Sequence, residues 1–102
     1  MTDKTMKPET IAAQSLGWID ETTRAVSPPI HLSSTFIRDP DNQYRSGREY
    51  GRSDNPTYDQ PEAVLAALEN GKDAMLLASG MAAATACFLA LKPGDHVVIP
   101  KV

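Results

Sequence analysis

The sequence has few cysteines, few aromatic residues and no long hydrophobic run. Its single cysteine, Cys87, cannot form an internal disulfide, so nothing in the sequence indicates an oxidising compartment. No apolar stretch approaches the roughly 20 residues that a helix needs to span a bilayer. The first ten residues, MTDKTMKPET, lack the apolar core of a signal peptide. We therefore expect a cytoplasmic protein that makes no contact with a membrane.

The sequence also lacks a strong excess of one charge. Its net charge is −3, with 41 % hydrophobic and 23 % charged residues, which is ordinary for a soluble globular protein. This balance gives no reason to expect nucleic acid or an anionic membrane as a partner.

His31 and His96 do not have the spacing of metal ligands, so no metal site is predicted. Cys87 is predicted to be a buried thiol rather than a nucleophile, because it lies among small and apolar residues.

Residues 1–56 hold most of the prolines and show little periodicity. Residues 7–17 favour a short helix that Thr10 caps and Gly17 ends. Residues 27–43 should be extended because of Pro28 and Pro29, and residues 40–56 are typical of a loop. This half has too little apolar surface to fold alone. We expect an N-terminal arm that packs on another domain or subunit.

Residues 57–102 have a different pattern. A helix is predicted from a cap at Thr57, with Pro61 in its first turn, to a stop at Gly71. Residues 73–79 and 96–100 are short apolar runs typical of buried parallel strands, and residues 80–92 between them favour a helix. The order strand, helix, strand predicts a right-handed βαβ unit and an α/β fold.

Two parallel strands with one crossover helix do not form a stable sheet in water. We therefore expect this chain to be a truncated piece of a larger α/β protein. Residues 1–56 would be its arm and loop, and residues 57–102 the start of its large domain.

Ser79 and Gly80 lie where the first predicted strand turns into the helix. A helix N-terminus attracts anions through its free N–H groups and partial positive charge. Ser79 offers a capping hydroxyl, Gly80 leaves room for an anion, and Met81 contributes its backbone N–H. A tight turn with an ordinary serine cap explains the same residues without any ligand, so both interpretations remain open.

Tyr50 and Arg52 form a second candidate group in the loop. A guanidinium has the planar geometry that suits phosphate, and a phenol can donate a hydrogen bond to the same anion. The alternative is an exposed loop pair without a function.

Three blocks of the sequence resemble the Cys/Met-metabolism family of pyridoxal-phosphate enzymes, which includes cystathionine γ-synthase, cystathionine lyases and methionine γ-lyase. They are PPIHLSSTF (28–36), YGRSDNPTYDQPEAVLAALENG (50–71) and ASGMAAATACFLALKPGDHVV (78–98). The resemblance implies fold type I, the cofactor pyridoxal 5′-phosphate, a sulfur-containing amino acid as substrate, and a homo-oligomer built as a dimer of dimers.

The resemblance also implies roles for individual residues. Those matching Gly80 and Met81 bind the cofactor phosphate of their own subunit, and Ser79 belongs to the same turn. Those matching Tyr50 and Arg52 reach the phosphate of a neighbouring subunit. The family's Schiff-base lysine has no counterpart here, since neither Lys72 nor Lys101 lies in its sequence context.

We therefore expect the N-terminal part of a transsulfuration lyase or transferase that holds the cofactor phosphate, with no catalytic residue of its own and no activity alone. The sequence does not distinguish γ-replacement from β- or γ-elimination. Two alternatives stay open: a non-catalytic oligomerisation piece, and a small anion-binding βαβ module.

Overall fold

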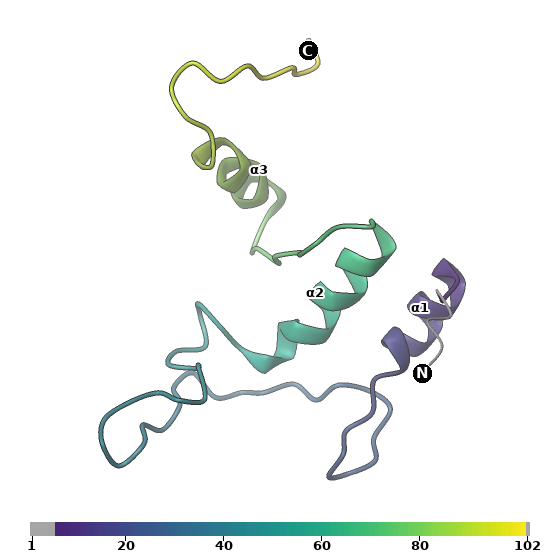
Figure 1. Ribbon diagram of the computed structural model, residues 1–102, viewed down its shortest axis with the longest axis vertical. Coiled ribbons are helices and arrows are strands. Elements are labelled where there is room, and N and C mark those ends of the chain that lie inside the picture. Colours follow the sequence, from purple (N-terminus) through teal and green to yellow (C-terminus); the bar gives the residue numbers. More distant parts are fainter. Residues whose placement is uncertain (1–5, 102) are drawn as a thin grey trace.

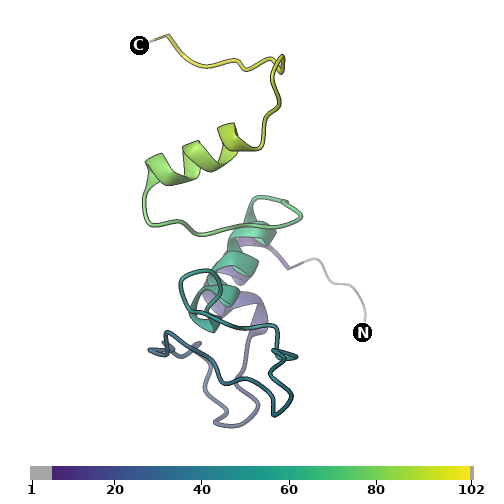
Figure 2. The same cartoon turned by 90° about the vertical axis from the view of Figure 1, so that its left-hand side faces the viewer.

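The computed structural model describes residues 6–101, which contain three α-helices and one short 3₁₀ turn. The helices are α1 (Pro8–Gln14), α2 (Pro56–Leu68) and α3 (Gly80–Leu89), and the 3₁₀ turn is Ser15–Gly17. Helices α1 and α2 pack side by side, whereas α3 lies apart from both (Figure 1, Figure 2). A long loop connects the first pair, and an extended tail follows α3.

Helix α1 begins at Pro8, directly after the extended residue Lys7, and no side chain caps it. The predicted cap at Thr10 is therefore wrong, because a proline fits the first helical position without losing a hydrogen bond. The predicted stop at Gly17 comes too late: the α-helix ends at Gln14 with Ser15 as its cap, and only the 3₁₀ turn extends to Gly17. Ser15 and Leu16 adopt left-handed backbone conformations, and Gly17 follows them with φ +74°.

Helix α2 begins earlier than predicted, and its cap is Asn55 rather than Thr57. The Asn55 side chain accepts a hydrogen bond from the Thr57 backbone N–H at 2.9 Å. Pro56 then occupies the first helical position, and Pro61 lies inside the helix. The helix ends at Leu68, and the Gly71 N–H donates to the Ala66 carbonyl at 2.8 Å.

Helix α3 begins as predicted, and Ser79 caps it. The Ser79 hydroxyl accepts a hydrogen bond from the Ala82 N–H at 3.1 Å. The two segments predicted as strands, residues 73–79 and 96–100, are extended but do not pair with each other. Within residues 6–101 the one β-type pairing is an isolated antiparallel bridge between Thr35 and Tyr50. The structure therefore shows the helix of the predicted βαβ unit without its parallel sheet.

The helices leave much of their apolar surface uncovered. The radius of gyration is 17.7 Å, against about 13 Å for a compact domain of 100 residues. Helix α3 has no packing partner among the described elements, so Phe88 and Leu89 are exposed. Cys87 is exposed as well, which contradicts the predicted burial of its thiol.

The packing of α1 on α2 depends on one apolar residue. Ile11 is 8 % exposed and is the one buried apolar side chain in the part of the chain that the structure describes. A polar contact supports it, because the Gln60 Nε2 donates to the Ser15 carbonyl at 2.6 Å.

We predict that Ile11→Ala detaches α1 from α2, since truncating a buried isoleucine costs about 2–5 kcal/mol. Backbone amides of α1 should lose their protection from hydrogen exchange. Ile37→Ala is the matched control, because Ile37 is 94 % exposed. Equal protection of α1 in both variants would contradict this account of the packing.

Candidate phosphate-binding residues and their supports

The loop that carries Tyr50 and Arg52 lies against the N-terminal arm. Residues 49–51 of this loop run antiparallel to residues 34–36 of the arm. The Gly51 N–H donates to the Ser34 carbonyl at 2.8 Å, next to the bridge between Thr35 and Tyr50. A Cβ atom on Gly51 would lie 3.0 Å from the Ser33 carbonyl oxygen, so the two backbones are in direct contact. The arm therefore forms one side of the loop's support.

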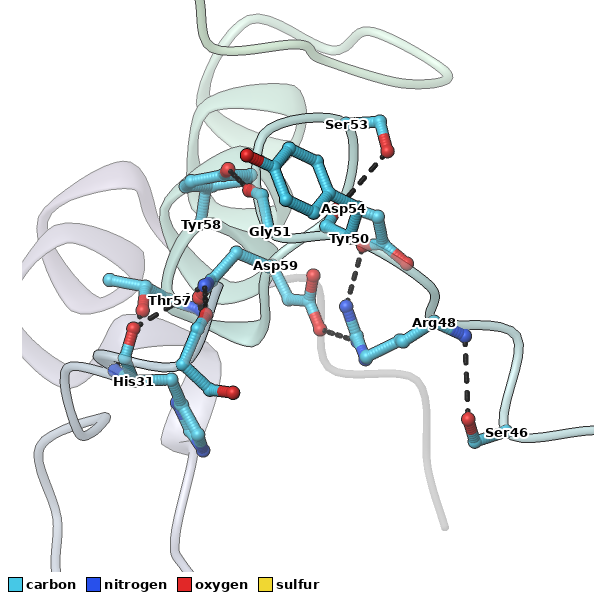
Figure 3. Close-up of polar contacts among 12 residues, drawn as sticks. His31, Ser46, Arg48, Tyr50, Gly51, Ser53, Asp54, Thr57, Tyr58 and Asp59 are labelled. Atoms are coloured by element: carbon cyan, nitrogen blue, oxygen red, sulfur yellow. Dashed lines mark hydrogen bonds and ion pairs between the residues drawn. The ribbon is translucent and has the colours of Figure 1, made fainter. Parts of the chain in front are cut away.

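Arg48 joins the same loop to helix α2. Its guanidinium pairs with the Asp54 carboxylate at 2.5 Å and also with the carboxylate of Asp59, which lies in the first turn of α2 (Figure 3). The Arg48 side chain is only 26 % exposed. Two charge-assisted contacts to one planar group fix its orientation. Arg48 thus holds the loop to α2.

The loop also makes its own hydrogen bonds. The Tyr58 hydroxyl, from α2, donates to the Gly51 carbonyl (Figure 3). The Asp54 N–H and the Ser53 hydroxyl both donate to the Tyr50 carbonyl, each at 3.1 Å. The backbone of residues 50–54 is therefore a closed turn, and the side chains of Tyr50 and Arg52 are left free to bind a ligand.

The structure brings the predicted pair together. The Arg52 guanidinium lies over the Tyr50 ring, 5.3 Å from its centroid, a distance at which a cation is attracted to an aromatic face. Both residues are exposed. Among the ion pairs formed within residues 6–101, none involves Arg52. Its positive charge is consequently available to an anion.

The second predicted group lies at the start of α3. Ser79 satisfies the N–H of Ala82 with its hydroxyl and that of Ala83 with its carbonyl. The N–H groups of Gly80 and Met81 have no hydrogen-bond partner within residues 6–101. A Cβ atom on Gly80 would meet nothing within 4 Å. These open donors at a helix N-terminus fit an anion.

Arg52 borders an open cavity of about 1160 Å³, which the segment before α3 and Ala82 of α3 also line. Its walls include Arg52, Asp54 and Tyr58 on one side and residues 73–78 with Ala82 on the other. Tyr50, Ser79, Gly80 and Met81 are not among its lining residues. Within one chain, therefore, the two predicted groups approach the same space, but they do not converge on a single point.

Sequence reasoning missed the residues that hold the loop, Arg48 and Asn55. Asn55 had a usable signal, since an asparagine directly before a proline is typical of a cap followed by the first helical residue. Arg48 had no such signal in the sequence, because its partners lie 6 and 11 residues further along the chain.

The outer part of the loop has a separate ion-pair group. Arg45 pairs with Asp41 and with Asp39, the latter at 3.5 Å. The hydrogen bond from Arg45 lowers the pKa of the Asp41 carboxyl and raises the pKa of the Arg45 guanidinium. Because the pKa of folded Asp41 is lowered, this contact stabilises the turn above the ordinary carboxyl pKa and is lost as the pH falls through the lowered value.

We predict that Arg48→Gln loosens the 48–54 loop, because it removes both charged contacts to Asp54 and Asp59. Hydrogen exchange of the Asp54 amide should become about 3- to 10-fold faster, as expected for the loss of partly buried charged hydrogen bonds. Arg45→Gln is the matched control, since it removes the same charge from the outer turn only. Equal acceleration in both variants would contradict a specific role for Arg48.

No cluster of three or more histidine, cysteine or acidic side chains within residues 6–101 could hold a metal ion. Among the same residues, no helix has the length and apolar character that crossing a membrane requires.

The chain is similar in sequence to a known protein family and to several of its members. Residues 9–102 match the model of the family described as Cys/Met metabolism PLP-dependent enzyme. The chain is 51 % identical over 82 residues to cystathionine gamma-synthase of Mycobacterium tuberculosis H37Rv, covering 79 % of this chain and 21 % of that protein. It is 46 % identical over 77 residues to human cystathionine gamma-lyase, covering 76 % of this chain and 19 % of the relative. The chain thus spans about a fifth of the length of these curated relatives.

A solved structure is similar as well. The crystal structure of metB from Corynebacterium glutamicum matches 89 % of this chain and 25 % of its own, with a TM-score of 0.70 and 38 % sequence identity. The predicted α/β fold type I class is therefore confirmed at the level of the family, although the parallel strands of the βαβ unit are not formed here. The chain belongs to the Cys/Met metabolism family of PLP-dependent enzymes.

Proposed function

We propose that this chain supplies the phosphate-binding part of a pyridoxal-phosphate-dependent transsulfuration enzyme of the cystathionine synthase or lyase type, acting on a sulfur-containing amino acid. The observation that carries the proposal is the family match over residues 9–102. Both relatives described above are cystathionine enzymes. We assign no catalytic residue to this chain; its residues bind and orient the cofactor.

The residues present fit a cofactor phosphate. Gly80 and Met81 have open N–H groups at the start of α3, and Gly80 leaves space beside them. Ser79 holds the turn in shape by capping the helix. Arg52 carries a charge that no carboxylate within residues 6–101 neutralises, and Tyr50 lies beneath its guanidinium. Backbone donors, a guanidinium and a phenol are together suited to a phosphate dianion.

We place the two groups on different copies of the chain, in a homo-oligomer. The resemblance to the family supports this arrangement. The geometry of the single chain is compatible with it, because the cavity that Arg52 borders is not lined by Ser79, Gly80 or Met81. In this arrangement residues 1–56 form an arm and a loop that present Tyr50 and Arg52 to a neighbour, and residues 57–102 begin the large domain. We place the enzyme in the cytoplasm.

Binding at these residues would fix the cofactor by its phosphate and so orient its ring. When bound, pyridoxal phosphate supplies an electron-withdrawing ring for chemistry at the carbons of the amino-acid substrate. Ser79, Gly80 and Met81 contribute position and neutral hydrogen bonds, while Arg52 contributes charge. This division of roles predicts that Arg52 matters most for the phosphate and little for the ring.

We predict that Arg52→Gln in the full-length protein weakens pyridoxal phosphate binding by about 100-fold, as expected for the loss of a charge-assisted bidentate contact. Binding of pyridoxal, which lacks the phosphate, should change by less than about twofold because no phosphate contact is lost. Cofactor absorbance during titration measures both affinities.

Arg38→Gln is the matched control, since Arg38 also lies over a tyrosine ring, that of Tyr44, at 5.1 Å. It should leave both affinities unchanged. Wild-type affinity for pyridoxal phosphate in Arg52→Gln would contradict the assignment of Arg52. If the wild-type protein bound no pyridoxal phosphate but formed a stable oligomer, the chain would be a non-catalytic oligomerisation piece instead.

A further inference from the structure

We propose that Asn55 is a positioning residue that makes the geometry of Tyr50 and Arg52 depend on attachment of the N-terminal arm. This inference rests on the proposed function, because it concerns the residues that would hold the phosphate. Asn55 would not contact the phosphate itself. It would act by positioning the 48–54 loop, which carries Tyr50 and Arg52.

Asn55 is the one buried polar residue in the part of the chain that the structure describes, with 7 % of its surface exposed. Its side-chain amide binds two elements at once. The Oδ1 atom accepts from the Thr57 N–H at 2.9 Å and so caps α2. The Nδ2 atom donates to the His31 carbonyl at 3.3 Å and to the Ser33 carbonyl at 3.2 Å, both in the arm.

Thr57 adds a second connection between the same elements. Its hydroxyl accepts a hydrogen bond from the His31 N–H at 2.8 Å (Figure 3). His31 therefore uses its N–H toward Thr57 and its carbonyl toward Asn55. The arm is tied to the start of α2 by three hydrogen bonds from two side chains.

The arm in turn contacts the residue between Tyr50 and Arg52. Gly51 donates to the Ser34 carbonyl, and its Cβ position would be 3.2 Å from the Asn55 Nδ2 atom. Asn55, the arm and Gly51 consequently meet at one point. If the arm leaves this point, the 48–54 loop loses the partner that sets the direction of the Tyr50 and Arg52 side chains.

Asparagine suits this position because its amide has an acceptor at one end and two N–H donors at the other. An aspartate keeps the acceptor and remains a good helix cap, and its charge is favourable at a helix N-terminus. It cannot donate, however, and it would place a carboxylate against two carbonyl oxygens. Asn55→Asp therefore separates the tie to the arm from the cap.

The test uses Asn55→Asp in the full-length protein, with titration by pyridoxal phosphate and by pyridoxal. We expect the affinity for pyridoxal phosphate to fall about tenfold, which corresponds to the net loss of one or two ordinary hydrogen bonds. The affinity for pyridoxal should stay within about twofold, because the residue acts through phosphate contacts only. Hydrogen exchange of the Gly51 amide should accelerate while the amides in the middle of α2 stay protected.

A second pair of variants keeps the proposal testable if Asn55→Asp does not fold. Thr57→Val removes the hydroxyl that binds His31, whereas Thr57→Ser keeps it. We expect Thr57→Val to show the same selective loss of pyridoxal phosphate binding and Thr57→Ser to restore it.

Unchanged affinity for pyridoxal phosphate in both Asn55→Asp and Thr57→Val would overturn the proposal, as would an equal loss for pyridoxal, which indicates a general structural role. The proposed function fails in a different way, namely if the wild-type protein itself shows no preference for pyridoxal phosphate over pyridoxal.

Discussion

The arrangement of the N-terminal arm, the 48–54 loop and α2 depends on the hydrogen bonds of the Asn55 side-chain amide. This amide caps α2 at one end and binds the arm at the other, at the point where the arm meets Gly51. With Ile11 as the single buried apolar side chain among residues 6–101, burial contributes little to holding the arm. Hydrogen bonds and the ion pairs of Arg48 therefore determine where Tyr50 and Arg52 lie, and a buried polar group of this kind is costly to leave without its partners.

The half of the chain that contains α3, in contrast, makes few contacts with the rest of the protein. Its segments are apolar and extended or helical, but they lack partners, as shown by the exposure of Phe88, Leu89, Val98 and Ile99. An extended apolar segment becomes a strand only when a neighbour accepts its backbone hydrogen bonds. The start of α3 nevertheless has its final form, because a serine cap and a run of alanines need only local contacts. The turn at Ser79–Gly80 is therefore formed without a sheet beside it.

Local signals in the sequence were enough to predict the elements that depend on local contacts. The Ser79 cap and the start of α3 were predicted correctly, whereas α1 ends three residues before the predicted stop at Gly17. The cap of α2 was placed two residues late, because Thr57 is also a capping type and the signal of an asparagine directly before Pro56 was missed. The predicted pairing of residues 73–79 with 96–100 is not formed, because neither segment has a backbone partner in a sheet among residues 6–101. Tyr50 and Arg52 were proposed from their residue types and lie together in the structure, whereas the contacts of Arg48 are evident only in the folded loop.

The claim that the two phosphate-binding groups come from different copies is tested most directly by subunit complementation. Arg52→Gln and Ser79→Asp each damage one group, and the aspartate preserves the helix cap. Neither variant alone should retain pyridoxal phosphate. If the site is shared between copies, co-expression gives mixed dimers in which one site is intact, so about a quarter of all sites should bind with wild-type affinity. Complete absence of such sites in oligomers shown to contain both variants would contradict the shared site and place both groups on one chain.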